Sequence, residues 1–143
     1  MKKEYISLLQ SNIGKNMGSK LPGFGGWLNA KIRSINESGD VQLDFEVRED
    51  MLNPMGNIHG GAMAGIIDEI LGFQLFLKSA EEAAYVSMTM NIDFLRPASL
   101  GDTITAVPSV VRIGKKTANV TCQLLNTDGK VLANAASNFI RVR

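Results

Sequence analysis

The sequence has few of the residues that build disulfide frameworks or metal centres. Cys122 is the only cysteine and His59 the only histidine among 143 residues. A single thiol excludes an intrachain disulfide, and one histidine without clustered ligands argues against a catalytic metal. We therefore expect no metal ion and no cofactor. Cys122 alternates with Val120 and Leu124, so we expect a packed thiol on the buried face of a strand.

Long apolar runs and an excess of one charge are also missing. The formal net charge is +1, whereas a nucleic-acid binder would need a strong basic stripe. Residues 1–10 lack the apolar stretch of a signal peptide. No run approaches the ~18 apolar residues of a membrane span. The sequence therefore predicts a protein of the reducing cytoplasm, with neither a nucleic acid nor a membrane as its partner.

What is present is the composition of a folded protein, with 45% hydrophobic and 20% charged residues. The length predicts a single domain over residues 1–143. Residues 3–13 have the spacing of a short amphipathic helix, and the glycine-rich residues 15–27 predict a loop. Phe24 and Trp27 in this loop either cover a pocket or pack onto the core, and packing is the favoured interpretation.

Hydrophobic periodicity predicts one long helix among six strands. Residues 28–36 and 41–48 predict a hairpin, and residues 61–79 predict a helix that is apolar nearly all round. Strands are expected at residues 85–97, 102–113, 117–126 and 130–143, with Pro108 marking a bulge or an edge. An apolar helix between the second and third strands must be wrapped by the sheet. This predicts an α+β protein of the hotdog type, with a curled antiparallel sheet around one central helix.

The segment with the clearest chemistry begins at Asn53, reaches His59-Gly60-Gly61, and continues to Asp68. Gly60 and Gly61 lie where a loop becomes a helix, so their backbone N–H groups lack helical partners and coincide with the positive end of the helix dipole. Such a place suits a carbonyl oxygen that gains negative charge. On composition alone, a plain turn residue before Pro54 is the favoured interpretation of Asn53, and His59 is equally a residue satisfied by nearby backbone.

Asp68 lies seven residues after Gly61 and therefore on the same helix face, among the small residues Ala64, Gly65 and Gly72. A carboxylate in a largely apolar helix costs free energy if it has only a structural role. Asp68 is therefore a candidate catalytic group. The alternatives are a solvated residue or one paired with a base. We expect its neighbour, Glu69, to be solvated.

The pattern N-x-x-G-x-x-H-G-G, with Asp68 nine residues after His59, resembles the hotdog acyl-CoA thioesterases of the phenylacetate-pathway type. The similarity continues through VSMTMNIDFLRPASLGDTITA and covers about residues 28–142. This resemblance implies that Gly60 polarises the thioester carbonyl and that Asp68 acts as nucleophile or general base. It implies that Asn53 orients the nucleophile or water, that His59 lies near the leaving sulfur, and that Ser87 assists the carboxylate.

The resemblance also implies an acyl-CoA substrate and a shared site. Coenzyme A would be part of the substrate, its phosphates held by exposed basic residues, for which Arg96, Arg112, Lys115 and Lys116 are the candidates. Asn53, His59 and Gly60 would come from one chain, Asp68 and Ser87 from another. The expected assembly is therefore a homodimer at minimum, and a homotetramer of two dimers. The acyl group is not readable from the sequence.

Two other functions are compatible with a hotdog fold. A hotdog dehydratase or hydratase would use a histidine and a helix carboxylate, although His-Gly-Gly is a different sequence setting. A non-catalytic acyl-CoA-binding protein is the other alternative. The known hotdog regulators carry an added DNA-binding domain, for which fewer than thirty residues before the first strand leave no room.

Overall fold

The computed structural model describes residues 2–143. The helical elements are α1 (Lys3–Gln10), η1 (Gly18–Lys20), α2 (Gly23–Leu28), η2 (Glu49–Met51) and α3 (Gly60–Lys78). The strands are β1 (Lys31–Ile35), β2 (Val41–Glu46), β3 (Tyr85–Phe94), β4 (Thr103–Ile113), β5 (Thr117–Leu125) and β6 (Val131–Arg141). Every expected helix and strand is therefore present, and no end differs from the expected one by more than three residues.

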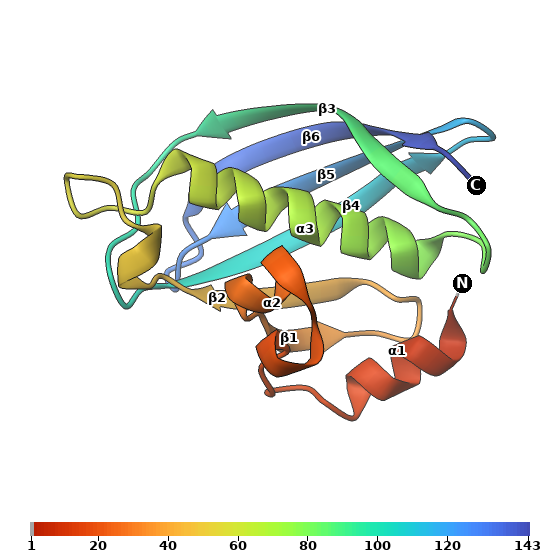
Figure 1. The fold of residues 1–143 in the computed structure, drawn as a ribbon, viewed down its shortest axis with the longest axis horizontal. Helices are drawn as coiled ribbons and strands as arrows, with labels where there is room; N and C mark the ends of the chain where they lie inside the picture. The colour runs from red at the N-terminus through yellow and green to blue at the C-terminus, as the bar shows by residue number, and fades with distance from the viewer. Residues whose placement is uncertain (1) are drawn as a thin grey trace.

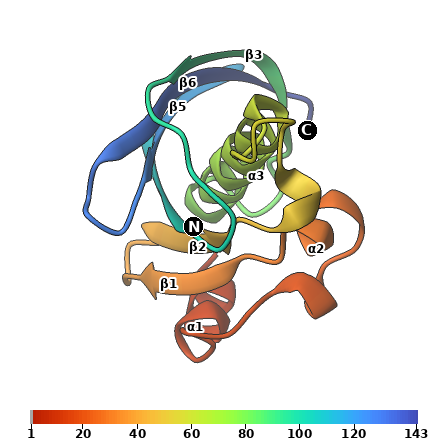
Figure 2. The same ribbon diagram turned by 90° about the vertical axis from the view of Figure 1, so that its left-hand side faces the viewer.

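One antiparallel sheet curls around α3 (Figures 1 and 2). The strand order is β1-β2-β4-β5-β6-β3, so β1 and β3 are the two edges. After α3 the chain crosses to the far edge, where β3 pairs with β6. This is the predicted hotdog architecture. Pro108 lies just beyond the last β2–β4 pair, Leu43–Ala106, at a position where β4 has no partner on that side, as the sequence predicts.

The core lies between α3 and the concave face of the sheet. Ile66, Ile67 and Ile70 are 0% exposed. The face of β2 that the alternation predicts to be buried is buried throughout, at Val41, Leu43, Phe45 and Val47. By length and mean hydropathy, 1.3, α3 is the one helix in residues 2–143 that could span a membrane. Its enclosure by the sheet is that of a core helix, whose apolar residues are buried against strands.

A buried polar residue joins α3 to the β1–β2 turn. Gln74 is 0% exposed. Its Oε1 accepts a 3.0 Å hydrogen bond from the Val41 N–H, and its Nε2 donates a 2.7 Å bond to the Gly39 carbonyl. Both backbone groups would otherwise be buried without a partner. Gln74 therefore fixes the first hairpin against the central helix.

The glycine-rich segment departs from the expected loop, because residues 23–28 form the short helix α2. Three of its six residues are glycine, which intrinsically disfavours a helix. Contacts from elsewhere hold it: Arg48 donates to the carbonyls of Trp27 and Leu28, at the last turn, and stacks 4.9 Å over the Trp27 ring. Asn29 then ends α2 in the left-handed region, with φ 53°.

The edge strand β3 is less covered than its alternating pattern predicts. Val86, Met88 and Phe94 are 49%, 52% and 53% exposed. The register also shifts between Ser87 and Thr89, which breaks the alternation. A long edge strand with exposed apolar side chains is a surface that pairs readily with another chain.

Candidate active site

The N-terminus of α3 leaves one backbone donor free. His59 is the N-cap, and its Nδ1 accepts a 2.8 Å hydrogen bond from the Gly61 N–H. The N–H groups of Ala62 and Met63 donate to the His59 carbonyl at 2.9 and 3.1 Å. The Gly60 N–H has no partner within residues 2–143. The helix dipole adds positive potential at the same place, so Gly60 is positioned to bind a negatively charged oxygen.

His59 therefore has the backbone-satisfied arrangement that the sequence left as an alternative. Because Nδ1 accepts a hydrogen bond from a backbone N–H, the neutral ring carries its proton on Nε2. The side chain is exposed. In this arrangement His59 orders the start of α3, and only its Nε2 side is available to a ligand.

Asn53 shapes the loop before α3. Its Oδ1 accepts hydrogen bonds from the N–H groups of Met55 (3.0 Å) and Asn57 (3.1 Å), and its own N–H donates to the Asn57 carbonyl at 2.7 Å. It is thus the turn residue that its position before Pro54 indicates. Its amide nitrogen makes no hydrogen bond within residues 2–143. Asn53 and Gly60 line one open pocket of about 300 Å³.

Asp68 and Ser87 form the second part of the candidate site. Ser87, in β3, donates a 2.7 Å hydrogen bond from Oγ to Asp68 Oδ1. Both side chains are exposed in the single chain. The structure therefore brings together the two residues that the family resemblance pairs. Within residues 2–143 the second carboxylate oxygen of Asp68 has no hydrogen bond, so a water or a substrate can bind to it.

Within one chain the two parts of the site are too far apart to act on one carbonyl group. Asp68 comes eight residues after Gly60 in a continuous helix. At 1.5 Å per residue the separation is about 12 Å along the axis. A carbonyl held by the Gly60 N–H is therefore beyond the reach of Asp68 of the same chain. The remaining small residues of this face are not equivalent, since Phe24 covers Gly65 while Gly72 is open.

The basic residues expected to hold phosphates lie at opposite ends of β3. Arg96 follows the end of β3 and lines the pocket of Asn53 and Gly60. Lys115 and Lys116 lie in the β4–β5 turn. The Lys116 carbonyl accepts a hydrogen bond from the Arg141 N–H, and Arg141 pairs with Tyr85. The turn is therefore near the start of β3. Arg112 is beside this turn. The four residues therefore form two separate basic sites in one chain.

Glu69 was expected to be solvated, and that expectation is wrong. Its side chain turns under α2, where Glu69 Oε1 would lie 2.5 Å from a Cβ at Gly25. Burial raises the pKa of this carboxyl, and the charge of Asp68 raises it further. Sequence reasoning missed it because helix periodicity says which face Glu69 is on, whereas the cover on that face comes from a segment expected to be a loop.

Comparison with known proteins agrees with this geometry. Residues 55–133, more than half of the chain, match the family model of the thioesterase superfamily. Mouse acyl-coenzyme A thioesterase 13 is 31% identical over 116 residues, which are 80% of this chain and 81% of the relative. The acyl-coenzyme A thioesterase PaaI of Escherichia coli is 31% identical over 106 residues, with 74% and 73% of the two chains covered.

Solved structures show the same fold. A phenylacetic acid degradation-related protein of Ralstonia eutropha has a TM-score of 0.75 and 27% identity, over 84% of this chain and 90% of that one. The smu.793 protein of Streptococcus mutans, solved with acetyl CoA bound, has a TM-score of 0.73 and 25% identity, over 80% and 89%. The chain belongs to the thioesterase superfamily and is an enzyme of that family.

Proposed function

We propose that the chain hydrolyses an acyl-CoA thioester to the free acid and coenzyme A. The observation that carries the proposal is the Gly60 N–H at the N-terminus of the central helix, which has no partner among residues 2–143. The same chain holds a carboxylate, Asp68, that is hydrogen-bonded by Ser87. Relatives that are named acyl-coenzyme A thioesterases support the substrate class, as does the neighbour solved with acetyl CoA.

In the proposed reaction the Gly60 N–H and the helix dipole stabilise the carbonyl oxygen as it gains negative charge. One such donor contributes about 2.7–4 kcal/mol to lowering a barrier. Asp68 either attacks the carbonyl carbon, giving an acyl–Asp68 anhydride that water then hydrolyses, or takes a proton from a water that attacks directly. In both cases the C–S bond breaks, coenzyme A leaves as the thiolate, and the acyl group is released as the free acid. A thioester has a good leaving group, so a carboxylate and one oxyanion donor suffice without a Ser-His-Asp triad.

The proposed site is shared between two chains. If two α3 helices pack antiparallel through Ala64, midway between Gly60 and Asp68, each Gly60 lies beside the Asp68 of the other chain. Gly61 and Ala64 are small enough to permit the close approach, although Phe24 covers the next residue, Gly65. The exposed edge β3 could continue its sheet into the partner. Asn53, His59 and Gly60 would then act with the partner's Asp68 and Ser87. A dimer is the minimum active unit, and two such dimers form the proposed tetramer.

Two basic sites are available for the phosphates of coenzyme A. Arg96 borders the pocket that contains Gly60 and Asn53. Arg112, Lys115 and Lys116 extend from the β4–β5 turn. Arg96 lies on the Gly60 side of the site, whereas the β4–β5 turn lies near the start of β3. In a shared site, Gly60 and Asp68 come from different chains. Basic residues of both chains would therefore lie near the same ligand.

The alternative function of a dehydratase or hydratase is less well supported by this geometry. Such an enzyme would need a histidine that can take a proton from the substrate. Here the Nδ1 of His59 accepts a hydrogen bond from the Gly61 N–H, so the neutral ring carries its proton on Nε2 and has no free lone pair there. A binding protein without activity remains the other outcome of the experiment below.

The proposal is tested by thiol release from a panel of acyl-CoAs, with wild type beside Asp68→Asn and Asp68→Ala. The protein's own thiol does not interfere, because Cys122 is 3% exposed and burial raises its pKa to about 12. We expect the rate of thiol release to fall about 100-fold or more in both variants, which is the range that general acid–base catalysis contributes. The melting temperature and the oligomeric state of both variants are measured as well, so that loss of the carboxylate is distinguished from loss of the fold or of the shared site.

Variants as active as wild type would remove Asp68 from the mechanism. If the wild-type protein binds an acyl-CoA but cleaves none, the result favours a non-catalytic acyl-CoA-binding protein.

A further inference from the structure

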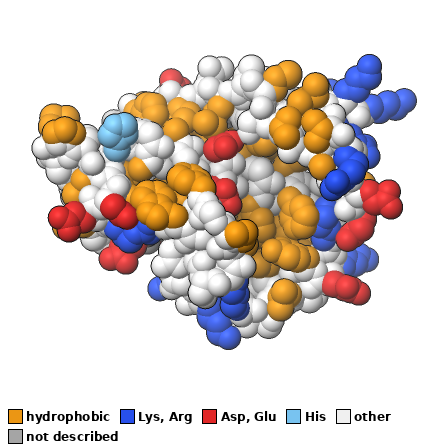
Figure 3. All heavy atoms as spheres, viewed as in Figure 1, with side chains coloured by type: hydrophobic (Ala, Val, Ile, Leu, Met, Phe, Trp, Pro, Cys, Tyr) orange, Lys and Arg blue, Asp and Glu red, His pale blue; other side chains and the backbone are white. Residues whose placement is uncertain are grey.

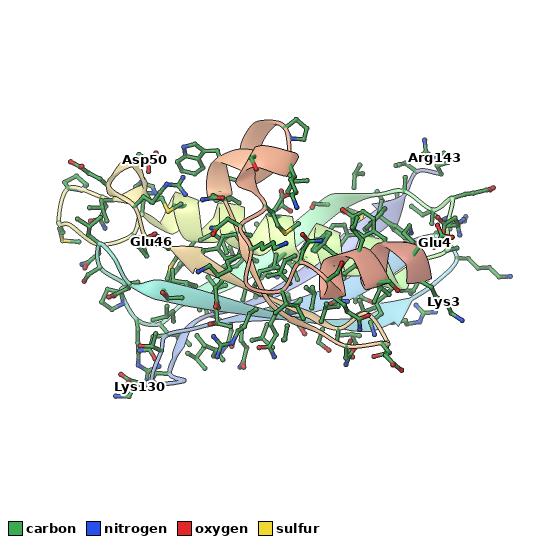
Figure 4. All side chains as sticks on the ribbon, turned by 90° about the horizontal axis from the view of Figure 1, so that it is seen from below. Lys3, Glu4, Glu46, Asp50, Lys130 and Arg143 are labelled. Atoms are coloured by element: carbon green, nitrogen blue, oxygen red, sulfur yellow. The ribbon has the colours of Figure 1, made fainter. Side chains whose placement is uncertain are left out.

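A partly open apolar pocket lies beside the candidate site, under α2. Its volume is about 160 Å³, and its lining includes Met17, Leu21, Gly25, Glu69 and Phe73. The helix α3 forms one wall, and α1 and α2 close the pocket from the outside. Figure 4 views this side of the molecule, with α1 and α2 lying over α3 and the sheet.

The pocket is close enough to Asp68 to hold part of the same substrate. Glu69 and Phe73 are the first and fifth residues after Asp68, so Phe73 is about 7.5 Å further along the helix axis. Between them Gly72 has nothing within 4 Å of where a Cβ would be. On the face of α3 seen in Figure 3, acidic side chains lie beside a hollow rimmed by apolar ones. An acyl group attached at Asp68 can therefore pass along Gly72 into the pocket.

The size and lining of the pocket indicate its occupant. A dry cavity of about 150 Å³ lined by aliphatic and aromatic side chains takes one benzene molecule. The pocket here is of this size and is lined by apolar and aromatic side chains around a single charged one. Beyond Tyr5, Met17 and Leu21 lies a second pocket of about 210 Å³, which these three residues separate from the first.

Glu69 is the exception in this lining. Its carboxyl group makes no hydrogen bond or ion pair with any side chain within residues 2–143, although the side chain is partly buried. A carboxyl group in an apolar pocket is destabilising unless something bonds to it. Burial also raises the pKa of this carboxyl, and the charge of Asp68 raises it further. The Glu69 oxygens still reach solvent, because no buried side-chain oxygen in residues 2–143 lacks a partner. A hydrogen-bond donor on a bound molecule would take the place of that solvent.

We propose that this pocket binds the distal end of the acyl group, and that Glu69 selects acyl groups carrying a hydrogen-bond donor there over apolar groups of the same size. The proposal rests on the proposed thioesterase function. The cover of the pocket comes from residues before position 30, outside the matched residues 55–133. The proposed selectivity therefore needs both Glu69 of α3 and the N-terminal residues that cover it.

The test uses pairs of CoA thioesters that differ by one hydroxyl group: benzoyl with 4-hydroxybenzoyl, and phenylacetyl with 4-hydroxyphenylacetyl. The measured quantity is the ratio of kcat/KM, hydroxylated over plain, in wild type, Glu69→Gln and Glu69→Leu. A general loss of activity cancels in this ratio. We expect wild type to favour the hydroxylated member of at least one pair, Glu69→Leu to lower that ratio at least tenfold, and Glu69→Gln, which still accepts a hydrogen bond, to lie between.

A second variant tests the pocket without Glu69. Leu21→Ala would open the wall toward the second pocket, so the preference should shift from hexanoyl-CoA toward decanoyl-CoA. An unchanged hydroxyl ratio in Glu69→Leu, in an enzyme that hydrolyses these thioesters, would overturn the role of Glu69. An unchanged chain-length preference in Leu21→Ala would overturn the pocket assignment.

A binding measurement separates failure of this inference from failure of the proposed function. Trp27 is the only tryptophan and lies in α2, stacked on Phe24. Its fluorescence is therefore a reporter for the covering segment. If no thioester is hydrolysed, but 4-hydroxyphenylacetate changes Trp27 fluorescence in wild type and not in Glu69→Leu, the pocket stands and the thioesterase proposal fails.

Discussion

The hydroxyl group of Ser87, in the edge strand β3, donates a 2.7 Å hydrogen bond to Oδ1 of Asp68, in the middle of the central helix α3. The two residues are 19 positions apart in the chain. The bond fixes one oxygen of the carboxylate and leaves the other free. The bond also connects the candidate catalytic carboxylate on α3 to the edge strand β3, which can pair with a second chain.

Replacing Ser87 by alanine is expected to lower kcat about tenfold or more without unfolding the protein. A hydrogen bond to a charged group contributes about 1.5–3 kcal/mol, and its loss leaves Asp68 free to rotate. Ser87 is exposed, so stability should change little. Thiol-release kinetics and thermal melting measure the two effects. Thr89→Ala, in the same strand but beyond the register shift, is the matched control and should keep its activity. Equal losses in both variants would mean a general effect on β3.

The proposed role of Gly60 as oxyanion donor can be tested with a substitution that removes its backbone N–H group. Gly60 is the first residue of α3, where proline is favoured, and His59 before it has φ −66° and ψ 139°, the extended conformation that a following proline requires. Gly60→Pro should therefore fold. We expect it to lose about 100-fold to 1,000-fold in kcat, as oxyanion-hole donors do.

Gly60→Ala is the control for the Gly60→Pro variant, because it keeps the N–H. Its Cβ would make only an ordinary contact with Phe94, at 3.6 Å. Its activity should stay well above that of the proline variant. If the two variants lose activity equally, crowding and not the donor explains the loss.

Gln74→Met is expected to destabilise the protein by about 2–4 kcal/mol, because two buried backbone groups, at Gly39 and Val41, lose their partner. Methionine has a similar length, so no large cavity results. Urea unfolding at neutral pH measures the change. Gln123→Met, at an exposed position of β5, should stay within about 0.5 kcal/mol of wild type. A stability of Gln74→Met equal to wild type would show that water reaches this turn.

Asp40 should make a small contribution to stability that depends on pH. A hydrogen bond from Lys78, and others from Asn36 and Ser38, lower its pKa from 3.8 to about 2. Because the pKa is lower in the folded state, this stability is fully present above about pH 4 and is lost as the pH falls toward 2. The Asp40 side chain is 57% exposed, so the contribution stays below about 1 kcal/mol.

The Asp40 contribution is measured as the difference in unfolding free energy between wild type and Asp40→Asn at several pH values. The difference should be constant above about pH 4 and shrink below it. A difference that grows as the pH falls would contradict this assignment.

Much of the fold follows from local patterns in the sequence. The alternation in residues 41–47 placed four side chains in the core, and all four are buried there. The helical period over residues 61–79 placed α3 to within a residue at each end. The motif from Asn53 to Asp68 likewise indicated the family and the candidate site. Side-chain period and turn chemistry act over a few residues, so they can be read without knowing what packs against them.

The tertiary structure decided which groups are free and which are covered. Helix α2 forms from a glycine-rich segment because Arg48 holds its carbonyls, and α2 then turns Glu69 from a solvated residue into part of a pocket. Only the folded chain shows that Gly61 is bonded to His59 while Gly60 is free. Each of these outcomes depends on contacts between segments distant in sequence or on the choice between neighbouring hydrogen-bond partners. A local pattern carries no information on either.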